Sequence, residues 1–151
     1  MRIGVIADTH GLVRPEALAA LAGSELIVHA GDVDRPDVLT ALARIAPVRA
    51  VRGNNDRGAW AKKLPASDEI EIGDRTIFVI HDLNELDRDA AAAGFAAVIA
   101  GHSHRPRNEL VGGVLFFNPG SAGPRRFSLP VTVGRIDVGA ELAASIIDLG
   151  V

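Results

Sequence analysis

Apolar segments and amphipathic segments alternate along the first third of the chain. Three short apolar segments, at residues 3–7, 26–30 and 48–51, are rich in β-branched residues and are typical of buried strands. After the first two of them, apolar residues recur at helical spacing behind Pro15 and Pro36, and proline is suited to the first turn of a helix. This order of strands and helices predicts a parallel sheet.

The second half of the chain has a different pattern, in which strands follow one another through short turns. Residues 68–72 alternate between polar and apolar side chains, Gly73 and Asp74 give a turn signal, and residues 76–80 are apolar, which together predict a hairpin. The other predicted elements are a helix at about 86–93, a strand over 97–100, and hairpins over 109–117 and 129–149. The two halves predict an α/β fold of mixed α+β character, in which two sheets pack face to face with helices outside.

The composition predicts one packed domain and excludes several classes of protein. Of the 151 residues 48% are apolar, so the chain can bury roughly two-thirds of its unfolded surface. It has 16 basic and 19 acidic residues and no basic run longer than two, which predicts no specific binding of nucleic acid. The absence of cysteine excludes disulfides, thiolate nucleophiles and cysteine-bound zinc. The apolar segments are too short for a signal peptide or a membrane span, so we expect a soluble cytoplasmic protein.

Polar side chains that suit metal ions follow almost every predicted strand. Because loops at the carboxyl ends of strands converge in α/β sheets, we expect these side chains to lie in one crevice. Neutral imidazole and carboxylate groups suit manganese, iron, nickel and zinc ions. The segments are Asp8-Thr9-His10, Gly31-Asp32, Gly53-Asn54-Asn55-Asp56, His81-Asp82 and Gly101-His102-Ser103-His104.

These segments contain more candidate ligands than one ion needs. The seven candidates are Asp8, His10, Asp32, Asn54, His81, His102 and His104. Two ions that share a bridging carboxylate would use them all, whereas one four-coordinate ion would not. Each segment alone has a simpler explanation, since Gly31-Asp32 is an ordinary turn signal and His81 could be a core histidine. His29 lies inside a predicted strand, and we expect it to lie in the core or behind the ligands.

The five segments, in this order, resemble the motifs of the calcineurin-like metallophosphoesterase superfamily. With Asn118-Pro119-Gly120-Ser121 they extend from Asp8 to Ser121, about three-quarters of the chain. Within the superfamily, the chain is similar to the small bacterial and archaeal phosphodiesterases related to the retromer subunit of the vacuolar sorting family. The resemblance implies one metallophosphoesterase domain over residues 1–151, folded as a four-layer αββα sandwich of two packed mixed β-sheets flanked by helices.

The resemblance also implies a role for each ligand, and the seven ligands are then the catalytic residues. One ion would be held by Asp8, His10 and His104, the other by Asn54, His81 and His102, with Asp32 bridging the two. Two divalent ions, with manganese expected and iron, nickel or zinc also suited, would hold a bridging hydroxide that attacks phosphorus in line with the leaving group. The substrate would be a small phosphate ester contacted by Asn54, Asn55 and Arg125. Relatives often form dimers or tetramers, so a homo-oligomer is compatible with the family.

Two positions depart from the family pattern. Asn55 stands where many members have a histidine that stabilises or protonates the leaving group, so the general acid is left open between His10 and water. Asp82 stands where glycine commonly follows the ligand histidine, and its carboxylate could tune the metal site or point away from it.

Three other functions fit parts of the pattern. The retromer subunit has this fold and acts mainly through protein contacts, so a catalytically weak metal-binding scaffold is one alternative, although every ligand position is filled here. A phosphomonoesterase with the same site is the second. An amidohydrolase also uses His-x-His pairs, but its (β/α)₈ barrel needs about 250 residues, which this chain does not have.

Overall fold

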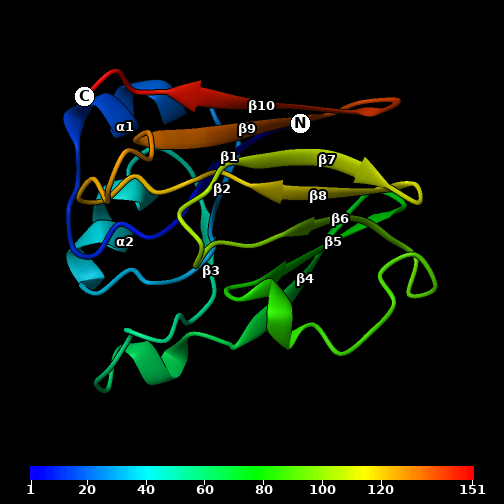
Figure 1. The fold of residues 1–151 in the computed structure, drawn as a ribbon, viewed down its shortest axis with the longest axis horizontal. Coiled ribbons are helices and arrows are strands. Elements are labelled where there is room, and N and C mark those ends of the chain that lie inside the picture. The colour runs from blue at the N-terminus through cyan, green and yellow to red at the C-terminus, as the bar shows by residue number, and fades with distance from the viewer.

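Two five-stranded β-sheets face each other in the computed structural model, which describes residues 1–151 (Figure 1). The first sheet has the strand order β10-β9-β1-β2-β3. Its strands are β1 (Arg2–Ile6), β2 (Leu26–His29), β3 (Val48–Ala50), β9 (Thr132–Val138) and β10 (Leu142–Asp148). β1, β2 and β3 run parallel, as the first half of the sequence predicts, and the final hairpin adds β9 and β10 in antiparallel orientation at the free edge of β1.

The second sheet has the strand order β4-β5-β6-β8-β7. Its strands are β4 (Ser67–Ile72), β5 (Arg75–Ile80), β6 (Phe95–Ile99), β7 (Arg107–Val111) and β8 (Val114–Asn118). β5, β6 and β8 are parallel, whereas β4 and β7 lie at the two edges as antiparallel partners in hairpins. The predicted hairpins are confirmed, and both sheets are mixed.

The main core lies between the inner faces of the two sheets. It contains 14 buried residues, including Val5 from the first sheet and Ile99 and Phe117 from the second. Helices α1 (Pro15–Leu21) and α2 (Pro36–Ala43) cover the outer face of the first sheet, and each begins at the proline that the sequence singled out. None of the helices combines the length and the apolar character that a membrane crossing would require.

No comparable helix covers the outer face of the second sheet. The helix predicted at about 86–93 is wrong, because this part of the chain forms only the 3₁₀ turn η2 (Leu83–Glu85) and one later turn. The Asp89 side chain accepts hydrogen bonds at the start of that later turn, and Gly94, with φ of 80°, ends it. Of the four consecutive alanines only Ala90 is buried, so no apolar face stabilises further turns. The fourth layer of the sandwich is therefore an irregular segment.

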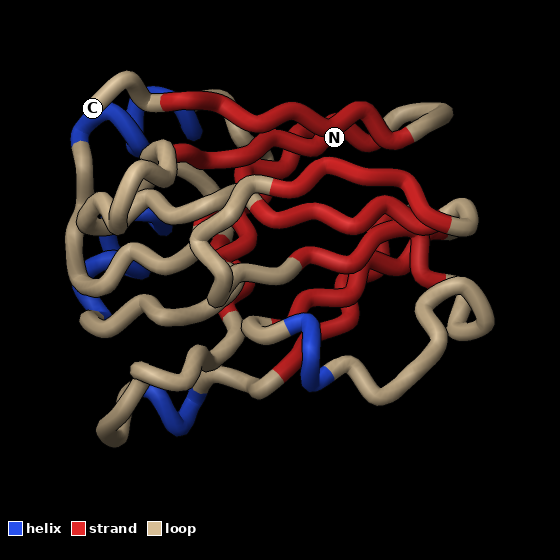
Figure 2. Tube along the Cα trace, viewed as in Figure 1, coloured by secondary structure: helices blue, strands red, loops and turns tan.

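The loops that follow β1, β2, β3, β5 and β6 gather at one end of the sandwich, on the left in Figure 2. The 3₁₀ turn η1 (Ala61–Lys63) lies in the connection between β3 and β4. Backbone hydrogen bonds join neighbouring loops within each sheet. In the first sheet the Asp8 N–H donates to the Gly31 carbonyl at 3.0 Å, and in the second the Ala100 and Gly101 N–H groups donate to the Phe117 and His81 carbonyls. The polar segments of the sequence therefore meet at this end.

Candidate metal centre

The side chains of all seven predicted ligands converge in two groups. Asp8, His10 and His104 form the first, and Asp32, His81 and His102 the second, and within each group the ligand atoms lie within 4.8 Å of one another. Asn54 completes the second group, because its Oδ1 lies 3.0 Å from His81 Nε2 and 3.2 Å from His102 Nδ1. The structure thus brings together every residue that the sequence singled out as a ligand.

Asp8 is the most deeply buried member of the first group, with no exposed surface. Its Oδ2 accepts a hydrogen bond from the His102 N–H at 3.0 Å. Its Oδ1 lies 3.6 Å from His104 Nε2 and has no hydrogen-bond partner. His104 Nε2 is in turn 3.3 Å from His10 Nε2. Two imidazole nitrogens therefore lie close to a buried carboxylate oxygen that accepts no hydrogen bond.

Asp32 lies between the two groups. Its Oδ2 is 3.3 Å from His81 Nε2 in the second group and 3.9 Å from His10 Nε2 in the first. Its Oδ1 accepts a hydrogen bond from the Asn55 N–H at 2.9 Å, which holds the carboxylate in this orientation. This is the position that a bridging ligand requires.

Two of the candidate ligand histidines are oriented by acceptors behind them. His10 Nδ1 donates to Asp34 Oδ2 at 3.1 Å, and His81 Nδ1 donates to the Ala30 carbonyl at 2.7 Å. Each bond leaves Nε2 facing the centre as the available ligand atom, which is the usual arrangement of metal-binding histidines. Neither acceptor could be identified from the sequence, because its role depends on the position of another loop.

Other polar residues of the motifs support the centre from outside it. The buried Asp56 carboxylate accepts the backbone N–H groups of Asp32, Asp34 and Gly53 at 2.8–3.1 Å. His29 is fully buried, as expected, and burial lowers its pKa to about 3. Its neutral ring accepts from the Gly31 N–H at 3.1 Å through Nδ1, so Nε2 carries the proton and donates to a threonine hydroxyl.

Asn55 and Asp82, the two positions that depart from the family pattern, both contact the centre. Asn55 Oδ1 accepts from Asn54 Nδ2 at 3.3 Å, which turns Asn54 Oδ1 toward the histidines. Asp82 Oδ1 caps η2, and its Oδ2 lies 3.8 Å from His102 Nε2. The Asp82 carboxylate therefore faces the site and does not point away from it.

Backbone strain is concentrated in these loops. Seven non-glycine residues of the chain have positive φ, and six of them are Asp8, His10, Asp32, Asp34, His102 and His104. Such conformations each cost on the order of 1 kcal/mol and persist where the surrounding structure holds them, commonly at functional sites. The packing is also close at Gly53, where a Cβ atom would overlap the Asp32 carboxylate and backbone.

Burial and neighbouring charges shift the pKa values of Asp8, Asp32 and His81 in different directions from their usual values. Burial raises the pKa of Asp8 to about 7 despite the nearby His81. Burial opposes ionisation of Asp32 too, but its hydrogen bonds with His81 and the Asn55 N–H outweigh burial and lower its pKa. Burial alone would lower the pKa of His81, whereas its bonds to Asp32 and the Ala30 carbonyl raise it to about 8. In the protein without metal, His81 therefore holds a proton next to the ionised Asp32, at the place where a cation would bind.

The donor set fits two divalent ions. The partnerless Asp8 Oδ1 and the facing imidazole nitrogens are buried polar atoms that a cation would satisfy, and buried carboxylates are costly without one. Two carboxylates, one carboxamide and four imidazoles form a set that suits manganese, iron, nickel or zinc.

A basic loop lies near the first ligand group. Burial lowers the pKa of His104 to about 4, and the positive charge of Arg126 is the next cause. Arg125, the residue that the sequence suggested as a phosphate contact, is exposed and makes no hydrogen bond or ion pair. Sequence reasoning missed Arg126, although the Arg-Arg pair was the available signal.

Known proteins share both the sequence motifs and the fold. Residues 1–141 match the model of the calcineurin-like phosphoesterase superfamily domain. A probable metallophosphoesterase of Methanothermobacter thermautotrophicus is 39% identical over 163 aligned positions, which cover 99% of this chain and 94% of that protein. The solved structure of an archaeal phosphodiesterase is 26% identical, with a TM-score of 0.80, and covers 97% of this chain and 100% of that one. Zinc-bound Vps29 of Entamoeba histolytica, at 20% identity, has the same fold, with a TM-score of 0.76 and 99% of both chains covered.

Two mixed sheets with carboxylates and imidazoles at the ends of their parallel strands define a metalloprotein of the phosphoesterase class. The chain belongs to the calcineurin-like phosphoesterase superfamily. The family resemblance seen in the sequence motifs is thereby confirmed.

Proposed function

We propose that this protein is a phosphodiesterase that depends on two divalent metal ions, with manganese as the expected ion. The observation that carries the proposal is the position of Asp32, whose Oδ2 lies between one group of three ligand residues and a second group completed by Asn54. When bound, such an ion pair would neutralise charge on a phosphate ester and lower the pKa of a water molecule toward neutrality.

The side chains around this centre favour an anionic substrate. The ligand set has only two carboxylates, so it does not cancel the charge of two divalent ions. Asn54 contributes a neutral amide oxygen where a carboxylate would add negative charge. Arg126, whose charge acts on His104, is the cation that we propose for contact with a phosphate oxygen, with Arg125 as its neighbour. Asn55 would orient Asn54 at the substrate-facing side of the second group.

Water is the nucleophile that the site supports. The hydroxyls of Ser121 and Thr9 donate to backbone carbonyl groups, and Ser103 Oγ accepts two hydrogen bonds. Thr9 is the only one of them bonded to a histidine, and His29 Nε2 donates its proton to that hydroxyl and cannot act as its base. No base is therefore placed to activate these hydroxyls for attack, and the chain has no cysteine. Hydrolysis is therefore the reaction class that we propose, not transfer through a covalent intermediate.

A diester is the preferred substrate class. The archaeal phosphodiesterase of 26% identity supports this choice. Asn55 is compatible with a diester substrate. A carboxamide cannot protonate a basic leaving group, but the aryloxide that leaves from an aryl diester does not need to be protonated. A phosphomonoesterase with the same site and a weakly active scaffold remain the competing functions.

The test compares bis(nitrophenyl) phosphate with nitrophenyl phosphate on purified protein with added manganese. We expect the diester to have the higher kcat/KM, and Asp32→Asn to abolish both activities. The reverse ranking would assign a phosphomonoesterase. A protein that binds no manganese in a calorimetric titration and hydrolyses neither ester would be a scaffold, as the likeness in fold to Vps29 allows.

A further inference from the structure

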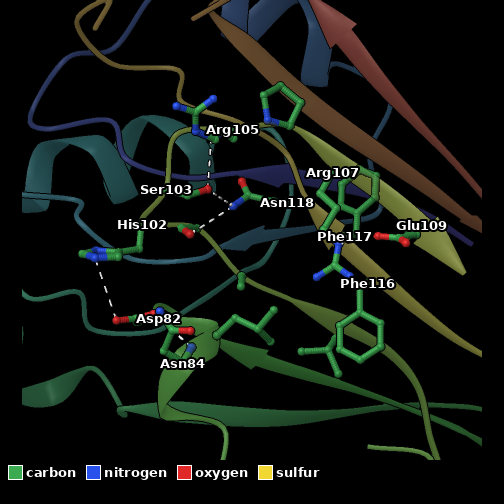
Figure 3. A pocket seen from close by; sticks show the side chains of 15 residues that line it. Asp82, Asn84, His102, Ser103, Arg105, Arg107, Glu109, Phe116, Phe117 and Asn118 are labelled. Atoms are coloured by element: carbon green, nitrogen blue, oxygen red, sulfur yellow. Dashed lines mark hydrogen bonds and ion pairs between the residues drawn. The ribbon is translucent and has the colours of Figure 1, made fainter. Parts of the chain in front are cut away.

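A cavity of about 440 Å³ opens on the outer face of the second sheet beside the metal centre (Figure 3). Its wall at the carboxyl ends of β6 and β8 is η2, because no longer helix covers this face. His102 lines the cavity and also belongs to the second ligand group. With 44% of its side chain exposed, His102 is open to this side. A phosphate ester held at the centre would therefore have an organic substituent within reach of the cavity.

A flat platform lies at the opposite end of the cavity from His102. The Arg107 guanidinium lies over the ring of Phe116, with Cζ 5.0 Å from the ring centre. Glu109 holds it there, since Arg107 Nε donates to Glu109 Oε2 at 2.9 Å. Val98 also lines the cavity. Guanidinium planes and aromatic rings are the surfaces on which flat rings stack in proteins.

The lining has balanced formal charge, because Arg105 and Arg107 are equal in number to Asp82 and Glu109. The cavity therefore does not favour a second phosphate group. The carboxamide of Asn84 lines the cavity and makes no hydrogen bond within the protein. An uncharged ring with a polar edge complements this lining.

We propose, on the basis of the phosphodiesterase function above, that this cavity binds a flat, uncharged aromatic group of the substrate ester, stacked on Arg107 and Phe116. The volume lies within the range of small-molecule sites, about 300–1,000 Å³, so one small group is the occupant and not a polymer. A nucleobase satisfies both the platform and the Asn84 carboxamide, whereas a simple aryl ring satisfies the platform alone.

Phosphonic acids test this proposal, because each carries one organic group on a carbon–phosphorus bond, which hydrolysis does not cleave. Methylphosphonate, benzylphosphonate and (thymin-1-yl)methylphosphonate would be titrated calorimetrically into the manganese-loaded protein. We expect the benzyl and thyminyl compounds to bind about tenfold more tightly than methylphosphonate, the effect of one stacking contact. Asn84→Ala should weaken binding of the thyminyl compound alone, and equal binding of all three phosphonates would overturn the proposal.

A matched pair of variants locates the contact. Arg107→Ala should remove the aromatic advantage, and this side chain is 39% exposed at an edge strand, so the fold should tolerate its loss. Arg88→Ala is the control, because Arg88 Cζ lies 5.1 Å from the ring centres of Phe78 and Phe95 outside the cavity. An equal loss in both variants, or no loss in Arg107→Ala, would contradict the proposal.

Turnover of bis(nitrophenyl) phosphate by the same preparations separates the two proposals. Hydrolysis without any aromatic advantage in binding would reject the cavity as an aromatic site and retain the phosphodiesterase. An aromatic advantage that Arg107→Ala removes, in a protein without turnover, would retain the aromatic site and reject hydrolysis.

Discussion

The backbone N–H of Asp32 donates a hydrogen bond to Asp56 Oδ2 at 3.1 Å, so a carboxylate outside the ligand groups holds the residue that lies between them. The same side chain accepts the N–H groups of Gly53 and Asp34, both at 2.8 Å. One buried side chain thus fixes the loops after β2 and β3 relative to each other. Its role in holding the fold differs from the role that we propose for Asp32 in binding metal.

Substituting these two aspartates should separate catalysis from stability. Asp32→Asn should abolish turnover and weaken binding of both ions, because a carboxamide cannot replace the charge between the two groups. Asp56→Asn should lower the free energy of unfolding by about 1–3 kcal/mol, since its amide nitrogen would face backbone N–H donors, and should reduce turnover much less. Urea unfolding and diester turnover measure the two effects. Comparable losses of turnover would mean that the bridging ligand has been misassigned.

Removing Asp34 should weaken metal binding at the first ligand group. Asp34→Ala leaves His10 Nδ1 without its acceptor, and the loss of such a partner typically costs 10–100-fold in metal affinity. Competition with a chelator would measure the affinity of each site. Asp37→Ala, which removes an exposed carboxylate paired only with Arg35, is the control and should leave both affinities unchanged.

Gly53→Ala should be poorly tolerated because its Cβ atom would overlap Asp32. Overpacking of this kind costs about 1–3 kcal/mol and displaces the neighbouring backbone, so metal affinity should fall with stability. Gly139→Ala is the comparison, since the nearest atom to a Cβ there is 3.9 Å away. Thermal unfolding of both variants, with and without manganese, would test the difference. Equal melting temperatures would show that the loop can move to accommodate a methyl group.

The stability of the metal-free protein should pass through a maximum near pH 6.5. Below it, His29 and His104, with pKa values lowered by burial to about 3 and about 4, bind protons more readily when unfolded, so stability rises with pH toward 6.5. Above it, His81, with its pKa raised to about 8, holds its proton more tightly when folded, so stability is lost as pH rises from 6.5 to 8. Asp8, with its pKa raised to about 7, loses its contribution between about pH 4 and 7, which offsets part of the rise that the two histidines produce. We expect a fall of about 2 kcal/mol between pH 6.5 and 8.

Manganese should move this maximum to higher pH, because metal binding displaces the protons held by the cluster. Urea unfolding at a series of pH values, with manganese or with a chelator, measures both curves. A metal-free protein whose stability rose steadily through pH 8 would contradict the raised pKa of His81.

The sequence predicted which candidate ligands would meet better than it predicted the residues that support them. Asp8 and His104 lie in the loops that follow apolar strands, so local spacing was enough to place them at one end of the sandwich. The contact of Asp34 with His10 joins residues 24 positions apart and depends on how two loops pack, which no local pattern reports. The Arg-Arg pair in the sequence does not show which of the two arginines acts on His104, and in the structure it is Arg126.

The failed helix prediction has a local cause. Alanine has the highest helix propensity, and four of them follow Asp89. Asp89 caps the start of this segment and Gly94 ends it, so only one turn can form between them. A single turn without a buried apolar face does not offset the free energy needed to nucleate a helix. The open flank of the second sheet, and with it the cavity beside His102, follows from these few residues.

Each ligand group draws side chains from both sheets. Asp8 and His10 follow β1 in the first sheet while His104 follows β6 in the second, and Asp32 is likewise grouped with His81 across the sandwich. A cation in either group would cross-link two sheets that otherwise meet through apolar packing and a few hydrogen bonds, such as those of Asp8 with His102 and of His81 with Ala30. Removal of the ions by a chelator would remove these cross-links, so the hydrophobic core between the sheets would open more easily to solvent and to proteases.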